Sequence, residues 1–387
     1  MLKFHSLRVA EVQPDAEDAV AVALDVPAEL QPEYAGLPGQ HVVLRAFLDG
    51  EEERRTYSLI NAPGEWPMRI VARVHKYGRM SRHIAQDVKV GDRIDVLPPN
   101  GSLTPRLTTV PTGSRATRTY VGFAAGCGIT PVLSVAKAIL RADVRSHFIL
   151  LYGNTSTGRV MCMEELLGLK DRYLEQLALH FVMSREPQEV ELYNGRIDAA
   201  RVREVAGILF EPDQVAEYFV CGPGDMIQQV SGVLRELGVG AERIHGEHFT
   251  VDAEKGGTER EAGTTGDEAG AAVREANAVH GTGAGHEAAS RPSDAVEVTV
   301  LIDGRRRTFT MKRNDDTILD AATRAGLELP YSCRAGVCST CRTKVVSGKV
   351  AMDQNYALED WELEQGYILA CQSRVKTPAL ELDYDEK

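Results

Sequence analysis

The first 250 residues of the chain show two successive patterns of apolar and polar residues. Up to about residue 105, short runs of alternating apolar and polar residues, such as 41–44 and 69–74, are separated by Pro and Gly turns. Alternation with a period of two is typical of strands with one buried face, so this region predicts a small antiparallel β-barrel. From about 117 to 250, apolar strands alternate with helical patterns, which predicts an α/β parallel sheet with helices on both faces. The strands expected in that sheet are 120–123, 148–152, 177–183 and 218–221.

The remaining third of the chain begins with a segment of different composition. Residues 251–293 are rich in Gly, Ala, Glu and Thr and almost free of aromatics, so they predict a flexible tether. Beyond it, alternating runs around an Asp303-Gly304 turn predict a hairpin, and 317–324 predicts a helix. The expected organisation is a barrel domain at 1–105, an α/β domain at 106–250, a low-complexity linker at 251–293 and an α+β domain at 294–387.

Four cysteines near the C-terminus have the spacing C-x4-C-x2-C-x29-C: Cys333, Cys338, Cys341 and Cys371. This arrangement is the plant-type ferredoxin pattern, in which four thiolates hold a [2Fe–2S] cluster. Gly336 lies within the loop, where the backbone must turn tightly and direct N–H groups at sulfur. The spacing therefore predicts a carrier of single electrons.

Other cysteine sites fit this pattern less well. Structural zinc sites usually present two C-x2-C pairs, whereas only Cys338 and Cys341 form one here. A thioredoxin-type pair would follow an active-site strand and precede a helix, and a Rieske centre needs histidine ligands, which this loop lacks.

Composition and charge narrow the partners and the compartment. The 387 residues carry a formal net charge of −12, which argues against nucleic acid and favours a basic protein partner. Seven cysteines, four of them assigned to a cluster, make a secreted disulfide framework improbable, so we expect a cytoplasmic protein. Neither a signal peptide nor a membrane span is indicated, because the N-terminus lacks an apolar core and the most apolar window, 119–140, contains Lys137 and several glycines.

The motif Arg55-Thr56-Tyr57-Ser58 closes one barrel strand and combines a cation, an aromatic ring and a hydroxyl. These groups suit a flavin, with guanidinium on phosphate, ring on isoalloxazine and hydroxyl toward its N5. By itself the motif is a weak signal, because Arg and Tyr on a strand are more often ordinary surface or edge residues.

A second segment makes a dinucleotide flavin the better interpretation. Gly78-Arg79-Met80-Ser81 precedes a helical stretch at 82–88, and Ser81 suits an N-cap beside which N–H groups would accept a pyrophosphate. A capped surface helix is the simpler alternative. We assign Val74, Gly78, Met80 and Ser81 to FAD together with the four-residue motif.

Residues 126–131, Gly-Cys-Gly-Ile-Thr-Pro, follow the strand at 120–123 and open a helix running to about Arg141. Thr130 suits a cap and Pro131 a first turn, so the positive helix end and free N–H groups would face phosphates. We therefore assign Gly126, Gly128 and Thr130 to a second nucleotide. A glycine turn without a ligand is the alternative.

The ends of two further strands complete the nucleotide site. Cys221-Gly222-Pro223-Gly224 ends a strand and starts a helix, which places the Cys221 thiol and Gly222 at the carboxyl edge of the sheet, beside a nicotinamide ring. Ser184-Arg185 follows the third strand, where a guanidinium favours the 2′-phosphate of NADPH, with NADH as the alternative donor. Tyr193 is assigned to the adenine or, alternatively, to the surface.

The two remaining cysteines are interpreted structurally. Cys127 is expected to be a small residue of the glycine loop, and Cys162 is expected to be a packed helix residue.

In this order, the motifs at 55–58, 126–131 and 221–224 resemble those of the ferredoxin-NADP reductase superfamily, and the tail resembles plant-type ferredoxins with their β-grasp fold. Residues 4–7, Phe-His-Ser-Leu, and 348–352, Gly-Lys-Val-Ala-Met, look most like the reductase subunits of phenylacetyl-CoA epoxidases. The resemblance covers the chain except the linker. It implies transfer from NADPH through FAD and the [2Fe–2S] cluster to a di-iron oxygenase that epoxidises the aromatic ring, and it places Phe249 near the flavin.

The resemblance also implies roles for individual residues, and it leaves alternative functions open. Nicotinamide gives two electrons as a hydride and the cluster accepts one at a time, so a flavin must stand between them. Ser58 and Cys221 are then the residues expected at the reacting atoms. Two other functions stay open: a reductase of another aromatic-ring or steroid hydroxylase, and a redox-responsive binding protein without turnover.

Overall fold

The structure, a computed structural model, describes residues 3–101, 103–105, 117–248, 295–313 and 316–386. The chain forms two compact units, residues 2–249 and 250–387, which are described separately. The predicted linker, 251–293, and Phe249 lie outside the described residues.

The N-terminal part of the first unit is a six-stranded antiparallel sheet with the order β4-β3-β6-β1-β2-β5. A bridge between Leu59 and Ile70 joins the end of β4 to β5 and closes the sheet on itself. Leu7, Leu24 and Leu44 are fully buried inside it, as the alternating pattern predicted. The strands are β1 (His5–Ala16), β2 (Ala19–Asp25), β3 (His41–Leu48), β4 (Glu51–Ser58), β5 (Met68–Arg73) and β6 (Arg93–Val96), and the helices are α1 (Gln31–Tyr34) and α2 (Arg79–Gln86).

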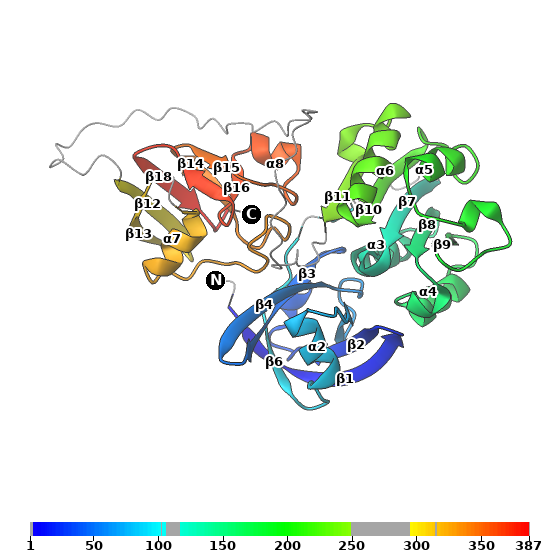
Figure 1. The fold of residues 1–387 in the computed structure, drawn as a ribbon, viewed down its shortest axis with the longest axis horizontal. Coiled ribbons are helices and arrows are strands. Elements are labelled where there is room, and N and C mark those ends of the chain that lie inside the picture. Colours follow the sequence, from blue (N-terminus) through cyan, green and yellow to red (C-terminus); the bar gives the residue numbers. More distant parts are fainter. Residues whose placement is uncertain (1–2, 102, 106–116, 249–294, 314–315, 387) are drawn as a thin grey trace, which may run out of the picture. The chain divides into compact units, whose positions relative to one another are not determined.

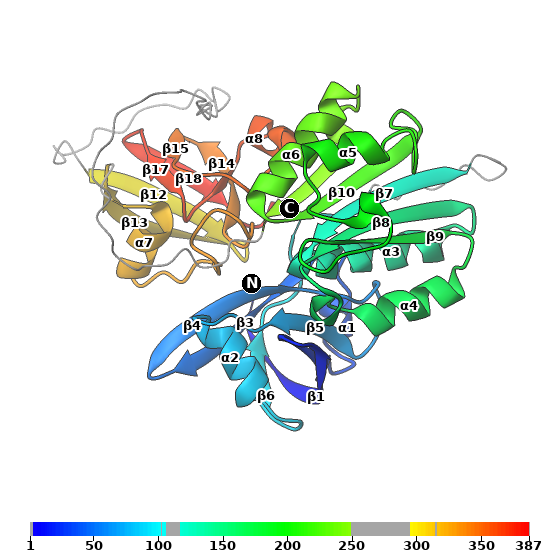
Figure 2. The same ribbon diagram turned by 45° about the vertical axis from the view of Figure 1, so that its right-hand side comes forward.

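The second half of this unit is a five-stranded parallel sheet with the order β11-β10-β7-β8-β9. Figure 1 and Figure 2 show its strands side by side with helices on both faces. Alternate residues of each strand enter opposite cores: Tyr120 and Phe148 pack with α3, whereas Val121 and Val220 pack with α6. All four predicted strands are present. The elements are β7 (Arg118–Ala125), α3 (Ile129–Ala142), β8 (Ser146–Asn154), α4 (Met163–Arg172), β9 (Leu177–Met183), α5 (Ala199–Val205), β10 (Val215–Gly222), α6 (Gly224–Glu236) and β11 (Ile244–His248).

Helix α3 holds the barrel against the parallel sheet. The Ser134 hydroxyl donates to the carbonyl of Asn61 (2.5 Å), and the Lys137 ammonium donates to the carbonyl of Ile60 (2.8 Å). Both acceptors lie in the loop after β4. Buried backbone carbonyls need such donors, so these contacts fix the end of β4 relative to the parallel sheet.

The C-terminal unit contains a five-stranded sheet, β13-β12-β18-β14-β16, and a two-stranded sheet, β15-β17. Asp303 and Gly304 join β12 to β13 with φ of 55° and 66°, as expected for the predicted two-residue hairpin turn. Thr317 caps α7 by accepting a hydrogen bond from the N–H of Asp320. The elements are β12 (Ala295–Ile302), β13 (Arg305–Lys312), α7 (Ile318–Arg324), β14 (Arg342–Ser347), β15 (Val350–Met352), α8 (Asp360–Glu364), β16 (Tyr367–Leu369), β17 (Ser373–Val375) and β18 (Ala379–Asp383).

The barrel, the parallel α/β sheet and the α+β ferredoxin-like unit confirm the predicted fold class. Among the described helices, none has the length and apolar character required to cross a membrane.

Candidate functional site

The motif at the end of β4 is divided between the two faces of the strand. Tyr57 pairs with Val42 across β3, whereas Ser58 pairs with His41. Arg55 therefore shares a face with Tyr57, and Thr56 shares a face with Ser58. A ligand that binds across the end of β4 can reach both faces, because the strand stops at Ser58.

Arg55 and Ser58 differ in how their polar atoms are satisfied. The Arg55 guanidinium lies 2.7 Å from a carboxylate oxygen of Glu53 and also donates to the carbonyl of Arg54. Ser58 is 3% exposed, and its hydroxyl has no hydrogen-bond partner among the described residues. A buried hydroxyl without a partner is costly, so Ser58 is suited to a ligand at this place.

Ser81 does not cap the helix that follows the barrel strands. Helix α2 begins at Arg79 with Gly78 as its N-cap, so Ser81 lies in the first turn and the predicted cap is wrong. The Ser81 hydroxyl accepts from the N–H of His75 (3.1 Å) and donates to the carbonyl of Gly78 (3.3 Å). It thereby closes the 75–78 loop, which lies next to Val74 at the end of β5. Met80 is buried in the barrel core.

Residues of two neighbouring strands, β8 and β10, contact the glycine turn after β7 and fix its backbone. Gly126 has φ of 54°, and its carbonyl accepts a hydrogen bond from the Tyr152 hydroxyl (2.9 Å). A Cβ at Gly128 would lie 2.1 Å from the carbonyl oxygen of Cys221, so only glycine fits between the ends of β7 and β10. Pro131 lies in the first turn of α3, as predicted.

Thr130 is the second prediction of a cap that the structure overturns. Gly128 is the N-cap of α3, and Thr130 lies within the first turn, where its hydroxyl donates to the carbonyl of Cys127 (2.9 Å). Thr130 therefore shapes the backbone of the turn. The N–H of Ile129 is used within the turn, where it donates to the carbonyl of Gly126, so the positive end of the α3 dipole is the feature that favours a phosphate at this place.

Cys221 lies at the carboxyl edge of the sheet, as predicted, one residue before Gly222, the last residue of β10. The Cys221 side chain is 0% exposed. Burial raises the pKa of the Cys221 thiol well above its ordinary value, and Glu247 and Cys127 add to that effect. The thiol is therefore protonated at neutral pH and is an apolar wall at this edge rather than a nucleophile.

Cys162 departs slightly from the expectation of a packed helix residue. It precedes α4 and has φ of 58°, and its N–H donates to the carboxylate of Asp15 in the barrel (2.9 Å).

The ends of β8 and β9 lie together. The N–H of Ser184 donates to the carbonyl of Asn154, and the N–H of Arg185 donates to the carbonyl of Thr155, both at 2.9 Å. The Arg185 side chain is exposed. Glu186, beside it, binds the N–H and hydroxyl of Thr157, and these hydrogen bonds lower the pKa of Glu186.

Tyr193 is less available than predicted. Its hydroxyl lies 2.9 Å from Nδ1 of His180, and the two rings are 5.8 Å apart. Tyr193 also packs against the core of the nucleotide domain. Stacking on an adenine would require the exposed part of its ring.

The four predicted ligand cysteines converge in the C-terminal unit. The contacts among these sulfurs lower the pKa of Cys333 and raise the pKa of Cys338 and of Cys371, and the N–H groups of Ala335 and Val337 also lower the pKa of Cys333. The N–H of Ala335 lies 3.3 Å from the Cys333 sulfur, and Gly336 has φ of 75°. A loop that directs N–H groups at sulfur stabilises thiolates.

No three His, Cys, Asp or Glu side chains of the described residues are placed around a single metal ion. The ligands of a [2Fe–2S] cluster are divided between two irons, so the paired sulfur contacts are compatible with this cluster.

Comparison with known families matches three parts of the chain. Residues 8–104 match an oxidoreductase FAD-binding domain, 123–232 match an oxidoreductase NAD-binding domain, and 300–376 match a 2Fe-2S iron-sulfur cluster binding domain. The chain is 36% identical to a subunit of 1,2-phenylacetyl-CoA epoxidase from Escherichia coli (strain K12), over 100% of this chain and 99% of the relative. The chain belongs to the FAD- and NAD(P)-dependent reductases with a C-terminal [2Fe–2S] domain.

Further similarities extend over the whole reductase. It is 29% identical to the ferredoxin reductase component of 3-ketosteroid-9-alpha-monooxygenase from Rhodococcus rhodochrous, covering 98% of this chain and 96% of the relative. The solved structure of phthalate dioxygenase reductase covers 98% of each chain with a TM-score of 0.54 and 22% identity, which shows the shared fold. The reductase is therefore an electron-transfer oxidoreductase with domains for a flavin, a pyridine nucleotide and an iron–sulfur cluster.

Two buried hydroxyls, one at the end of a barrel strand and one after a strand of the parallel sheet, are suited to bound ligands. Besides Ser58, the buried hydroxyl of Thr155 at the end of β8 has no hydrogen-bond partner among the described residues. Ser58 lies in the segment that matches the FAD-binding domain and Thr155 lies in the segment that matches the NAD-binding domain, so each segment contains a buried hydroxyl that is available to a ligand.

Sequence reasoning missed a buried pair between the two domains. His41, 1% exposed in β3, places Nδ1 3.2 Å from a carboxylate oxygen of Glu247 in β11. Because His41 pairs with Ser58 across the strands, this contact holds the end of β11 close to the motif of β4. The sequence feature that could have indicated this pair is a polar residue, His41, within the otherwise apolar run 41–44.

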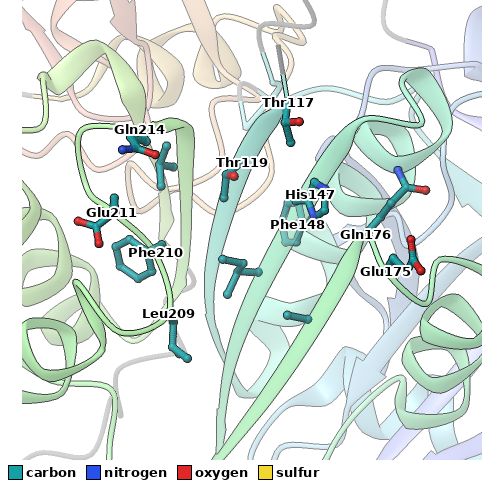
Figure 3. A pocket seen from close by; sticks show the side chains of 13 residues that line it. Thr117, Thr119, His147, Phe148, Glu175, Gln176, Leu209, Phe210, Glu211 and Gln214 are labelled. Atoms are coloured by element: carbon teal, nitrogen blue, oxygen red, sulfur yellow. The ribbon is translucent and has the colours of Figure 1, made fainter. Parts of the chain in front are cut away.

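A cavity of about 400 Å³ lies at the opposite edge of the parallel sheet. Figure 3 shows Thr119 and His147 from the amino ends of β7 and β8 together with Phe210 and Glu211. Ligands of open α/β sheets bind outside the carboxyl ends of the strands. This cavity is therefore separate from the glycine turns, which remain the candidate nucleotide site.

Proposed function

We propose that the reductase passes electrons from NADPH through FAD and the [2Fe–2S] cluster to the di-iron oxygenase of a phenylacetyl-CoA epoxidase complex. The full-length identity of 36% to a component of the Escherichia coli epoxidase supports this client. The family and the cysteine chemistry support a cytoplasmic location. We also propose the domain limits 1–105, 106–250, 251–293 and 294–387.

Each domain has a separate task in this transfer. A bound flavin accepts an electron pair as hydride and releases single electrons, which reconciles the nicotinamide with the cluster. Ser58 would orient the reacting edge of the flavin, and Arg55 would neutralise its phosphates after leaving Glu53. The turn from Gly126 to Gly128 would position the nucleotide. Such positioning accounts for most of the rate in a hydride transfer that needs no general base.

Cys221 would form the wall behind the nicotinamide. Its thiol is fully buried, so it would act by packing and not as a nucleophile. We therefore expect Cys221→Ala to slow flavin bleaching by NADPH about tenfold in stopped-flow, because a misplaced ring reduces the fraction of reactive geometries. FAD content should remain unchanged. An unaltered bleaching rate would refute this role.

We assign the preference for NADPH to the exposed guanidinium of Arg185, which follows the end of β9. An arginine there pairs with a 2′-phosphate, although the neighbouring Glu186 opposes it. We expect Arg185→Ala to raise the KM for NADPH about tenfold while the KM for NADH stays constant. Arg172→Ala, which removes an exposed arginine at the end of α4, is the matched control. Equal use of both donors by the wild type would defeat the preference.

The client can be tested by oxygen consumption. Purified reductase, the epoxidase oxygenase and phenylacetyl-CoA should consume oxygen with NADPH, and omission of the CoA thioester should abolish most of it. Reduction of an artificial dye by NADPH serves as the internal control. Normal dye reduction without coupled oxygen consumption would reject this client and favour another hydroxylase, such as a steroid hydroxylase.

A further inference from the structure

Tyr384 carries a buried hydroxyl that the transfer pathway above does not use. The residue follows β18 directly, and its backbone N–H donates to the carbonyl of Leu301 (2.9 Å). Its side chain is partly exposed and packs against the core of the C-terminal unit. The hydroxyl oxygen is buried, and it has no hydrogen-bond partner among the described residues.

The strand pairing brings this residue beside two ligand cysteines. Asp383 pairs with Lys344 of β14, which begins one residue after Cys341. The carbonyl of Cys341 in turn accepts from the N–H of Ala370 (3.1 Å), so Cys371 lies at the same place. Both cysteines belong to the core against which Tyr384 packs.

The hydroxyl is a donor in this environment. A tyrosine hydroxyl keeps its proton at neutral pH, and the sulfurs of Cys341 and Cys371 are close enough to act on it electrostatically. A buried donor without a partner calls for an explanation. The acceptors of suitable charge at this place are the sulfurs of these two cysteines, which are thiolates when they hold iron.

We propose that the Tyr384 hydroxyl donates a hydrogen bond to the sulfur pair of Cys341 and Cys371 when the cluster is bound, and thereby raises the reduction potential of the cluster. Hydrogen bonds to the sulfurs are among the factors that set these potentials. The donor favours the reduced cluster because reduction adds negative charge to its sulfurs. Tyr384 acts through the ligands and is a positioning residue; the inference rests on the proposed cluster.

The test replaces Tyr384 by Phe in the full chain, which removes the oxygen and keeps the ring. A redox titration followed by EPR should show the equilibrium constant for cluster reduction falling about tenfold, which corresponds to a potential lower by ~59 mV for a one-electron couple. The potential of the FAD in the same sample should stay constant. Tyr356→Phe, which removes the hydroxyl of a tyrosine 41% exposed in the same unit, should leave both potentials unchanged.

A measurement on the wild type tests the hydrogen bond even if the Tyr384→Phe variant fails to fold. Resonance Raman bands of the iron–sulfur stretches should shift when the protein is exchanged into D2O, and Tyr384→Phe should lose part of that shift. An unchanged potential in a fully loaded variant, or an isotope shift equal to that of the wild type, would overturn the inference alone. A wild-type chain without iron and sulfide would overturn the proposed function as well.

Discussion

Replacement of Lys137 by Met tests how the barrel is held against the nucleotide domain. Lys137 is 4% exposed, and its ammonium donates to the carbonyl of Ile60 and to a carboxylate oxygen of Glu165 (2.5 Å). A carboxylate oxygen of Glu65 lies 3.7 Å away. Methionine keeps the apolar stem and removes the charge, so the change isolates the polar contacts.

The expected loss in the free energy of unfolding depends on the polar groups that Lys137→Met leaves without a partner. Removing one partner of a fully buried ion pair costs about 3–5 kcal/mol. The side chains of Glu65 and Glu165 keep 28% and 30% exposure, so water recovers part of their solvation and about 1–2 kcal/mol remains. The buried carbonyl of Ile60 loses its donor, which adds about 1 kcal/mol. We therefore expect a loss of about 2–3 kcal/mol in the free energy of unfolding.

Urea unfolding followed by far-UV circular dichroism measures this loss. With a slope of about 2 kcal/mol per molar, the midpoint of the first unit should fall by about 1 M. Lys89→Met, at an exposed lysine of the barrel, should change the stability by less than about 0.5 kcal/mol. The double variant Lys137→Met, Glu165→Gln should lose less than the sum of the single changes. Equal midpoints for Lys137→Met and Lys89→Met would refute the reasoning.

Three further changes test the site and its support. Gly128→Ala places a Cβ 2.1 Å from a carbonyl oxygen of β10, so flavin bleaching by NADPH should slow at least about tenfold, whereas Gly232→Ala, in open space on α6, should not alter it; equal rates would contradict the argument. Cys371→Ser should abolish the EPR signal of the reduced cluster and keep dye reduction by NADPH; a retained signal would remove Cys371 from the ligand set. Burial raises the pKa of Glu65, but Lys137 and other donors outweigh it and leave the pKa lowered. Its stabilisation is therefore complete above its unfolded pKa near 4.5 and is lost as the pH falls through the lower folded value. Glu65→Gln should flatten the decline of the melting temperature below about pH 5, and parallel curves would reject this assignment.

Local patterns were sufficient for much of the architecture. The strand β9 was predicted with its observed bounds, 177–183, because its residues form an apolar run interrupted only by His180. The four cysteines could also be recognised as a candidate ligand set from the sequence, since the geometry of the cluster imposes a spacing on the chain. The turn at Asp303-Gly304 was predicted because few residue pairs adopt two successive positive φ angles.

Two predicted helix caps were wrong. Ser81 and Thr130 are good cap residues, yet Gly78 and Gly128 occupy the N-cap positions. Gly128 does so because the carbonyl of Cys221, from a strand more than 90 residues later, approaches too closely for any side chain. The position of that carbonyl is a property of the assembled sheet.

The sequence by itself determined the three kinds of domain, and it predicted the ligand cysteines and the strand ends proposed for the nucleotides, because each of these depends on local patterns of residues. The tertiary structure alone decided the pairing of His41 with Glu247, the burial of Lys137 on the carbonyl of Ile60, and the placement of Tyr384 beside Cys341 and Cys371. These contacts join residues from separate elements, and a buried polar group finds its partner only after those elements have packed.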